Sequence, residues 1–125
     1  MTYEFDGHLV EITIDRDTTF AERVALYHQI RADARIPDGA LILLDARLHV
    51  ETLTQSVIAE RIPLIRQALG PKMGSVFAVL VSKDRKIDGM LFQVVAAEQN
   101  VRVGIFIDRA MARQWLRAYL PPIAS

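Results

Sequence analysis

The chain has 125 residues, with 15 basic and 15 acidic side chains and no cysteine. This length is typical of one domain, which can bury about two-thirds of the surface that its unfolded chain exposes. The absence of cysteine excludes disulfide frameworks, thiol catalysis and zinc sites with cysteine ligands, and the balanced charge argues against nucleic-acid binding. We therefore expect a single domain over residues 1–125.

The first part of the chain predicts a β-hairpin followed by a helix. Two short strands are expected over residues 3–6 and 8–14, and the second alternates apolar and polar side chains. Thr19 and Glu22 have the spacing of a capping box, in which the hydroxyl accepts from the backbone and the carboxylate reaches back. A helix should therefore begin there and continue to about Ala34.

The middle of the chain predicts a buried strand and a long helix. Residues 41–44 are all apolar, which is typical of a strand that is buried on both faces of a sheet. A helix is expected over residues 51–69, closed by Gly70 and Pro71. Pro63 lies inside this helix and removes one backbone hydrogen bond, which predicts a kink or a break near that position.

The last part of the chain predicts two more strand–helix units. Strands are expected over residues 76–81 and 101–107, and the helix between residues 84 and 98 contains Gly89, which weakens it. Asp108 should cap a final helix. The apolar residues expected on the inner faces are Ile87, Leu91, Val94 and Val95 in the first helix and Met111, Trp115, Leu116 and Tyr119 in the second, which Pro121 and Pro122 end.

The resulting order, ββαβαβαβα, predicts an α/β domain with a mixed sheet. The N-terminal hairpin strand should be antiparallel, and right-handed crossovers should make the later strands parallel. In such sheets ligands bind beyond the carboxyl ends of the parallel strands. Polar residues follow these ends at 45–49, 82–85 and 108–109, so a small-molecule site is expected there.

Sequence motifs for catalysis and metal binding are absent. The six glycines form no phosphate-binding loop, and the three histidines lie far apart along the chain. Asp15 and Asp17 are neighbouring carboxylates with no further ligand patterned nearby. We therefore expect no enzymatic activity, no cofactor and no metal.

Three stretches carry a family resemblance. They are LILLDAR at 41–47, FAVLVS at 77–82 followed by IDGM at 87–90, and VRVGIFIDRA at 101–110 followed by ARQWL at 112–116. In this order they resemble STAS domains (sulfate transporter and anti-sigma-factor antagonist) and, more narrowly, the bacterial SpoIIAA-like group. The resemblance covers nearly the whole chain and implies a STAS-like fold without a catalytic site.

For this group the resemblance implies binding of an apolar small molecule under mobile helices, or contact with a membrane surface. We expect a pocket between the sheet and the helices over 51–69 and 87–98, and the irregularities at Pro63 and Gly89 would let those helices move. The residues expected at this site are Leu53, Val57, Leu91 and Val94, with Asp45, Arg47 and Lys83 at the strand ends.

A protein-interaction switch of the anti-sigma-factor-antagonist kind is the alternative function. In such proteins a kinase phosphorylates a serine that opens the helix after the central strand. The corresponding stretch here is 51–56, which has no Asp-Ser pair but offers the hydroxyls of Thr52 and Thr54.

The charges divide unevenly along the chain. Residues 1–62 have a net charge of −5 and residues 63–125 have a net charge of +5, so a basic flank that contacts an anionic surface is expected. An acidic N-terminal stretch without an apolar run predicts a cytoplasmic protein. The expected partner is an apolar small molecule or a protein rather than nucleic acid, and the oligomeric state stays open, with a homodimer as one option.

Overall fold

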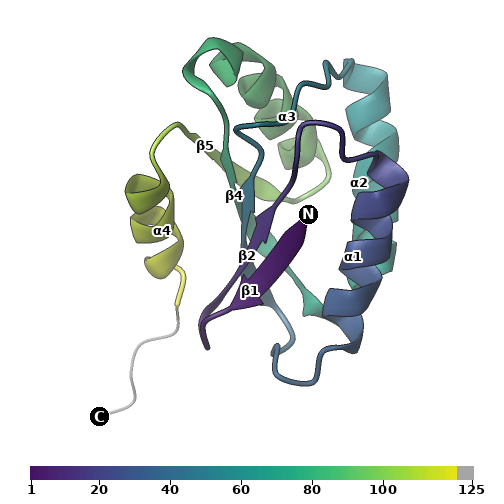
Figure 1. Ribbon diagram of the computed structural model, residues 1–125, viewed down its shortest axis with the longest axis vertical. Coiled ribbons are helices and arrows are strands. Elements are labelled where there is room, and N and C mark those ends of the chain that lie inside the picture. Colours follow the sequence, from purple (N-terminus) through teal and green to yellow (C-terminus); the bar gives the residue numbers. More distant parts are fainter. Residues whose placement is uncertain (121–125) are drawn as a thin grey trace.

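Five strands lie in one sheet, and their order in the sheet is their order in the chain (Figure 1). The computed structural model describes residues 1–120. The elements are β1 (Thr2–Phe5), β2 (Leu9–Thr13), α1 (Phe20–Ala32), β3 (Ala40–Asp45), α2 (Gln55–Leu69), β4 (Met73–Leu80), α3 (Lys86–Glu98), β5 (Arg102–Phe106) and α4 (Arg109–Arg117), with short 3₁₀ turns η1 (Gly70–Lys72) and η2 (Lys83–Arg85). The chain thus forms an α/β domain, as its sequence predicts.

The sheet is mixed, because β1 pairs antiparallel with β2 and the other neighbours are parallel. Each crossover leads to the next strand in the same direction, so crossovers of one hand place their helices on one side. Figure 1 shows this result: α1, α2 and α3 cover one face of the sheet, and α4 covers the other.

Two apolar cores fill the space between these layers. The side chains of the central strand alternate between them, since Ile42 packs under α1–α3 and Leu43 packs against α4. Both faces of β3 are therefore buried, which explains its uninterrupted apolar sequence. The smaller core consists of Leu9, Leu41, Leu43, Val76, Ala78, Leu80, Ala112 and Leu116.

The first helix begins as predicted. The Thr19 hydroxyl accepts from the Glu22 amide at 3.1 Å, and the Glu22 carboxylate accepts from the Thr19 amide at 3.0 Å, which completes the capping box. The second helix begins later than predicted, at Gln55 rather than at residue 51, because Thr54 is its N-cap and accepts from the Val57 amide. Residues 51–53 consequently belong to a loop.

The break predicted at Pro63 does not occur, and the helix continues to Leu69. A proline at this position leaves the carbonyl of Ala59 without its helical donor. The side-chain amide of Gln99 supplies a replacement, with 2.9 Å between Gln99 Nε2 and the Ala59 oxygen. This contact between α2 and the end of α3 explains how the proline is accommodated.

The third helix presents the predicted face to the sheet only in part, since Leu91 packs against the larger core and Val95 is buried. Ile87 and Val94 are 81% and 59% exposed, whereas Val95 and Gly89 are buried. A Cβ on Gly89 would lie 2.8 Å from Ile105 Cγ2, so the glycine allows the helix to approach β5 closely. Gly89 therefore serves packing, and the expectation that it marks a mobile lid has no support in these contacts.

The last helix is capped as predicted but buries fewer residues. The Asp108 carboxylate accepts from the amides of Ala110 and Met111 at 2.7 and 3.2 Å. Met111 itself is 60% exposed, so its predicted place on the inner face is wrong, while Leu116 is fully buried and Trp115 packs against Phe106. Tyr119 lies beyond the helix, and the predicted stop at residues 121–122 lies outside the described residues.

Ion pairs join the basic half of the chain to the acidic half. Arg109 Nε lies 2.6 Å from Glu11 Oε1, and Arg113 Nη2 lies 2.7 Å from Asp6 Oδ2. These contacts fasten α4 to the hairpin. Arg109 and Arg113, which belong to the basic second half of the chain, are therefore paired with acids of the first half. Within residues 1–120 no helix is long and apolar enough to cross a bilayer.

The Asp6 carboxylate should contribute to stability in a pH-dependent way. Burial raises the pKa of Asp6, but hydrogen bonds from the Leu9 and His8 amides and from Arg113 outweigh burial and lower the pKa to about 2, below its ordinary value of 3.8. The ionised carboxylate stabilises the fold above pH 3.8, and this contribution is lost as the pH falls through about 2.

Replacing Asp6 should therefore reduce the pH dependence of folding. We expect Asp6→Asn to flatten the fall in unfolding free energy between about pH 4 and pH 2, measured by urea denaturation at several pH values. The matched control is Asp17→Asn, on the exposed loop before α1. Equal slopes for the two variants would contradict this role for Asp6.

Candidate functional site

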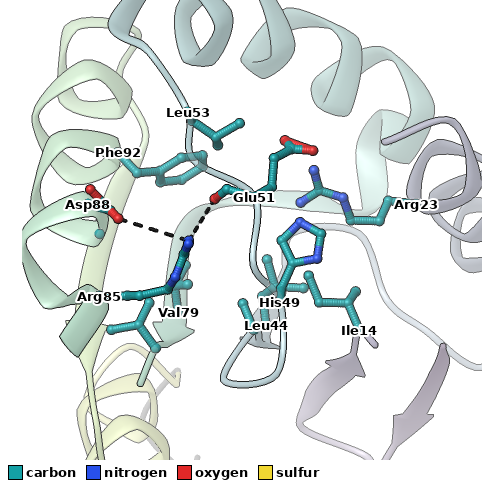
Figure 2. A pocket seen from close by; sticks show the side chains of 13 residues that line it. Ile14, Arg23, Leu44, His49, Glu51, Leu53, Val79, Arg85, Asp88 and Phe92 are labelled. Carbon is teal, nitrogen blue, oxygen red and sulfur yellow. Dashed lines mark hydrogen bonds and ion pairs between the residues drawn. The ribbon is translucent and has the colours of Figure 1, made fainter. Parts of the chain in front are cut away.

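A cavity of about 100 Å³ opens at the edge of the sheet where β2, β3 and β4 end (Figure 2). This is the carboxyl edge, where the strand order predicts a site. The lining of the cavity combines apolar and polar side chains. The apolar lining is Ile14, Leu44, Ala46, Leu53, Val79, Val81, Gly89 and Phe92, and the polar lining is Arg23, His49, Glu51, Arg85 and Asp88.

The alternation of side chains along β3 decides which predicted residues reach this cavity. Leu44 and Ala46 line it, whereas Asp45, between them, points to the opposite face of the sheet, toward the α4 layer. There Asp45 accepts two hydrogen bonds from Arg47, at 2.8 and 3.0 Å. Burial raises the pKa of Asp45, but the Arg47 hydrogen bonds outweigh it, and the pKa is lowered.

Of the seven residues predicted from the sequence to form the ligand site, Leu53 alone lines the cavity. Asp45 and Arg47 pair with each other, and Lys83 is exposed in η2. Val57 and Leu91 are half-buried but do not reach the cavity, and Val94 faces solvent. The space between α2, α3 and the sheet, where these residues were expected to hold a ligand, is only about 20 Å³.

The hydroxyls considered for phosphorylation lie at the start of α2. Thr52 and Thr54 are both exposed, and Thr54 is engaged as the N-cap of the helix. Its hydroxyl also lies 3.3 Å from that of Ser56. These positions are accessible to a kinase, so the protein-interaction switch stays a prediction that phosphate mapping after incubation with a kinase would test.

The loop between β3 and α2, residues 46–54, forms one wall of the cavity. Arg85 holds it from the α3 side, donating to the carbonyl of Glu51 at 2.9 Å and to that of Val50 at 3.1 Å (Figure 2). Arg61 of α2 holds it from the other side through an ion pair with the Glu51 carboxylate. The wall is therefore tied to both neighbouring helices.

Arg23 is the most unusual residue of the lining. It belongs to the first turns of α1 and is 7% exposed, which is rare for a charged side chain. Within residues 1–120 its guanidinium forms no ion pair and no hydrogen bond, and its Nε is fully buried without a partner. Its guanidinium carbon lies 5.2 Å from the centre of the Phe20 ring, which gives it a cation–π contact only.

His49 places a second unpartnered nitrogen in the lining. Its Nδ1 lies 3.2 Å from the carbonyl oxygen of Asp15. Because a carbonyl can only accept, we assign the proton to Nδ1. The other ring nitrogen, Nε2, is buried and has no partner in the described part of the chain. Figure 2 shows the His49 ring and the Arg23 guanidinium directed toward the same part of the cavity, beside Glu51.

The Glu51 carboxylate does not neutralise Arg23. Burial raises the pKa of Glu51, but the hydrogen bond from Arg61 and the charges of Arg61 and Arg23 outweigh it, so the pKa is lowered. Glu51 is thus ionised and bonded to Arg61. The site combines an apolar floor with one buried cation that has no bonded counter-charge.

A wider depression of about 620 Å³ lies near the start of β5 and the end of α3. Its charged residue, Arg102, already donates to the Tyr119 hydroxyl at 2.9 Å. None of its polar side chains is both buried and unpartnered among residues 1–120. The cavity with Arg23 is therefore the better candidate for a ligand site.

No family model, curated protein or solved structure that was compared with this chain matches it. The mixed α/β fold is compatible with a STAS-like domain, but no relative supports that narrower assignment. The function is therefore inferred from the geometry of the cavity.

The sequence pattern carried one overlooked signal for this site. Arg23 falls on the same helical face as Phe20, Tyr27 and Ile30, where an apolar residue is expected. An arginine at a core-facing position of the helix indicates a buried charge, and a buried charge is a signal for a functional site. His49 gives no such signal, because it lies in a loop whose path the sequence does not determine.

Proposed function

We propose that this domain is a STAS-like, non-enzymatic module that binds a small molecule in the cavity at the carboxyl ends of β2, β3 and β4. The observation that supports this most is the presence of two buried, unpartnered nitrogens, Arg23 Nε and His49 Nε2, on the wall of one cavity. More than about 90% of buried polar groups in proteins have a partner. A ligand that enters the cavity would supply the missing partners.

The cavity volume limits the size of the ligand. A designed cavity of ~150 Å³ holds a benzene ring, whereas pockets for drug-sized molecules have ~300–1,000 Å³. The observed 100 Å³ corresponds to about three water molecules, or to a small branched hydrocarbon group. The long apolar chain of a lipid does not fit a cavity of this volume, so the proposed ligand is a small molecule.

A panel of small probes tests this proposal. Native mass spectrometry of the purified protein should reveal a bound small molecule, and the melting temperature should rise in the presence of isovalerate, 3-methylbutan-1-ol, 2-methylpropan-1-ol or propan-2-ol. A probe at 100 times its dissociation constant stabilises the folded chain by about 2.7 kcal/mol. If no ligand co-purifies and no probe raises the melting temperature, the proposal is wrong.

Contact with an anionic membrane surface is the second candidate, and one feature of α3 favours it. Ile87, Met90 and Val94 are exposed at helical spacing, and the exposed Lys83 and Lys86 precede them. An apolar stripe beside lysines is typical of peripheral membrane helices. Co-sedimentation with anionic vesicles, lost at high salt and with neutral vesicles, would support this function; equal recovery with both vesicles would contradict it.

A further inference from the structure

We infer that the ligand is a small monocarboxylate with a compact hydrocarbon group, and that its carboxylate pairs with Arg23. This inference rests on the proposed function and names the class of ligand. The three arginines around the cavity differ in one respect. Arg61 pairs with Glu51, and Arg85 donates to two loop carbonyls, but Arg23 has no hydrogen-bonded partner within residues 1–120.

The unpaired charge of Arg23 calls for an anion. Removing a cation from water is unfavourable by several kcal/mol unless an opposite charge or hydrogen bonds compensate. At 7% exposure, Arg23 has little water to solvate it. Its guanidinium offers a planar set of donors that matches the two oxygens of a carboxylate, whereas a cationic ligand would be repelled.

The number of free charges favours a carboxylate over a phosphate. A phosphate ester carries about −1.5 to −2 charges near neutral pH, and one unpaired guanidinium neutralises only one of them. The other nearby cations are already paired with carboxylates, Arg61 with Glu51 and Arg85 with Asp88 at 4.0 Å. The Glu51 carboxylate would also repel a second negative charge. One negative charge is therefore the best match for this site.

The apolar floor determines the rest of the ligand. Ile14, Leu44, Val79 and Phe92 are among the apolar residues that line the cavity and would contact a hydrocarbon group. By the same scale, a volume of 100 Å³ accommodates roughly three or four carbon atoms, each contributing about 0.8 kcal/mol on burial. With the proton on Nδ1, the second unpartnered nitrogen, His49 Nε2, can only accept a hydrogen bond, so an ionised carboxylate does not pair with it and the pairing with Arg23 orients the ligand.

Isothermal titration with three probes of one carbon skeleton tests the charge preference. The probes are isovalerate, the neutral 3-methylbutan-1-ol and the cationic 3-methylbutylamine. We expect isovalerate to bind about 10- to 100-fold more tightly than the alcohol, which is the usual strength of a hydrogen bond to a charged group, and the amine not to bind.

Two variants with the same change in net charge connect that preference to Arg23. Arg23→Met should lower the affinity for isovalerate about 10- to 100-fold and leave that for the alcohol unchanged. Its melting temperature should not fall, because the substitution removes an unpaired buried charge. The control, Arg16→Met on the exposed loop before α1, should bind all three probes like the wild type.

The possible outcomes separate the inference from the proposed function. If the alcohol binds as tightly as isovalerate and Arg23→Met changes neither affinity, the carboxylate inference is wrong while the cavity remains a binding site. If none of the three probes binds the wild type, the inference fails. If the melting temperature responds to none of the neutral probes in the thermal panel either, and no ligand co-purifies, the proposed function is overturned as well.

Discussion

Leu116→Ala should lower the free energy of unfolding by about 2–5 kcal/mol, because it leaves a cavity beneath α4. Leu116 is fully buried in the smaller core, where α4 covers Leu41 and Leu43 of the central strand. Within residues 1–120 the core on this face consists of eight buried residues, so little else there can fill the space that the leucine leaves. Urea denaturation monitored by circular dichroism measures the effect.

Met111→Ala is the matched control on the same helix. Met111 is 60% exposed, so its truncation should change the unfolding free energy by less than about 0.5 kcal/mol. The helical periodicity places both residues on the inner face, and the structure separates them. Similar losses for the two variants would show that α4 packs on the sheet in a different orientation.

Ala46→Leu should abolish the binding of every small ligand to the cavity. Ala46 follows β3 directly, and its side chain lines the cavity beside Leu44. Three additional carbon atoms would fill much of a space of about 100 Å³. Since the new side chain fills an existing cavity, the stability of the unliganded protein should stay the same or rise.

The control for this variant is Ala25→Leu, which adds the same group to an exposed position on α1. It should bind isovalerate and 3-methylbutan-1-ol like the wild type. Titration calorimetry and thermal unfolding measure both variants. If Ala46→Leu retains wild-type affinity for either probe, the ligand binds elsewhere on the molecule.

The sequence predicts the fold well where local chemistry determines it. Thr19 with Glu22 and Asp108 determine where two helices begin, and both caps are present in the structure. The apolar run at 41–44 identifies the strand that is buried on both faces. These features depend on residues close together in the sequence, which is why patterns of spacing reveal them.

The faces of the later helices could not be predicted in the same way. In α3, Ile87 and Val94 fit the helical period as well as Val95 does, so the apolar pattern alone does not select a face. The close approach of Gly89 to Ile105 selects it, and this contact joins residues from different elements. The continuity of α2 through Pro63 likewise depends on a donor from Gln99, which follows the end of α3.

The candidate site, like the fold, could be predicted from the sequence only in part. Parallel strands place their carboxyl ends together, so the edge that holds the cavity follows from the predicted topology. The polar residues of the cavity do not follow from that topology. Arg23 comes from α1, and His49 comes from a loop that Arg85 holds in place. Asp45 ends β3 and Arg47 lies two residues further along, but the two side chains pair with each other on the face of the sheet opposite the cavity.

A ¹⁵N-detected NMR titration with isovalerate tests the central claim most directly, because it locates the bound ligand. The account predicts that the largest shifts occur at the amides of the cavity lining and at the Arg23 Nε–H signal, with little change on the exposed face of α3. Shifts centred on Ile87, Met90 and Val94, or no shifts at millimolar isovalerate, would contradict the proposal that this cavity is the binding site.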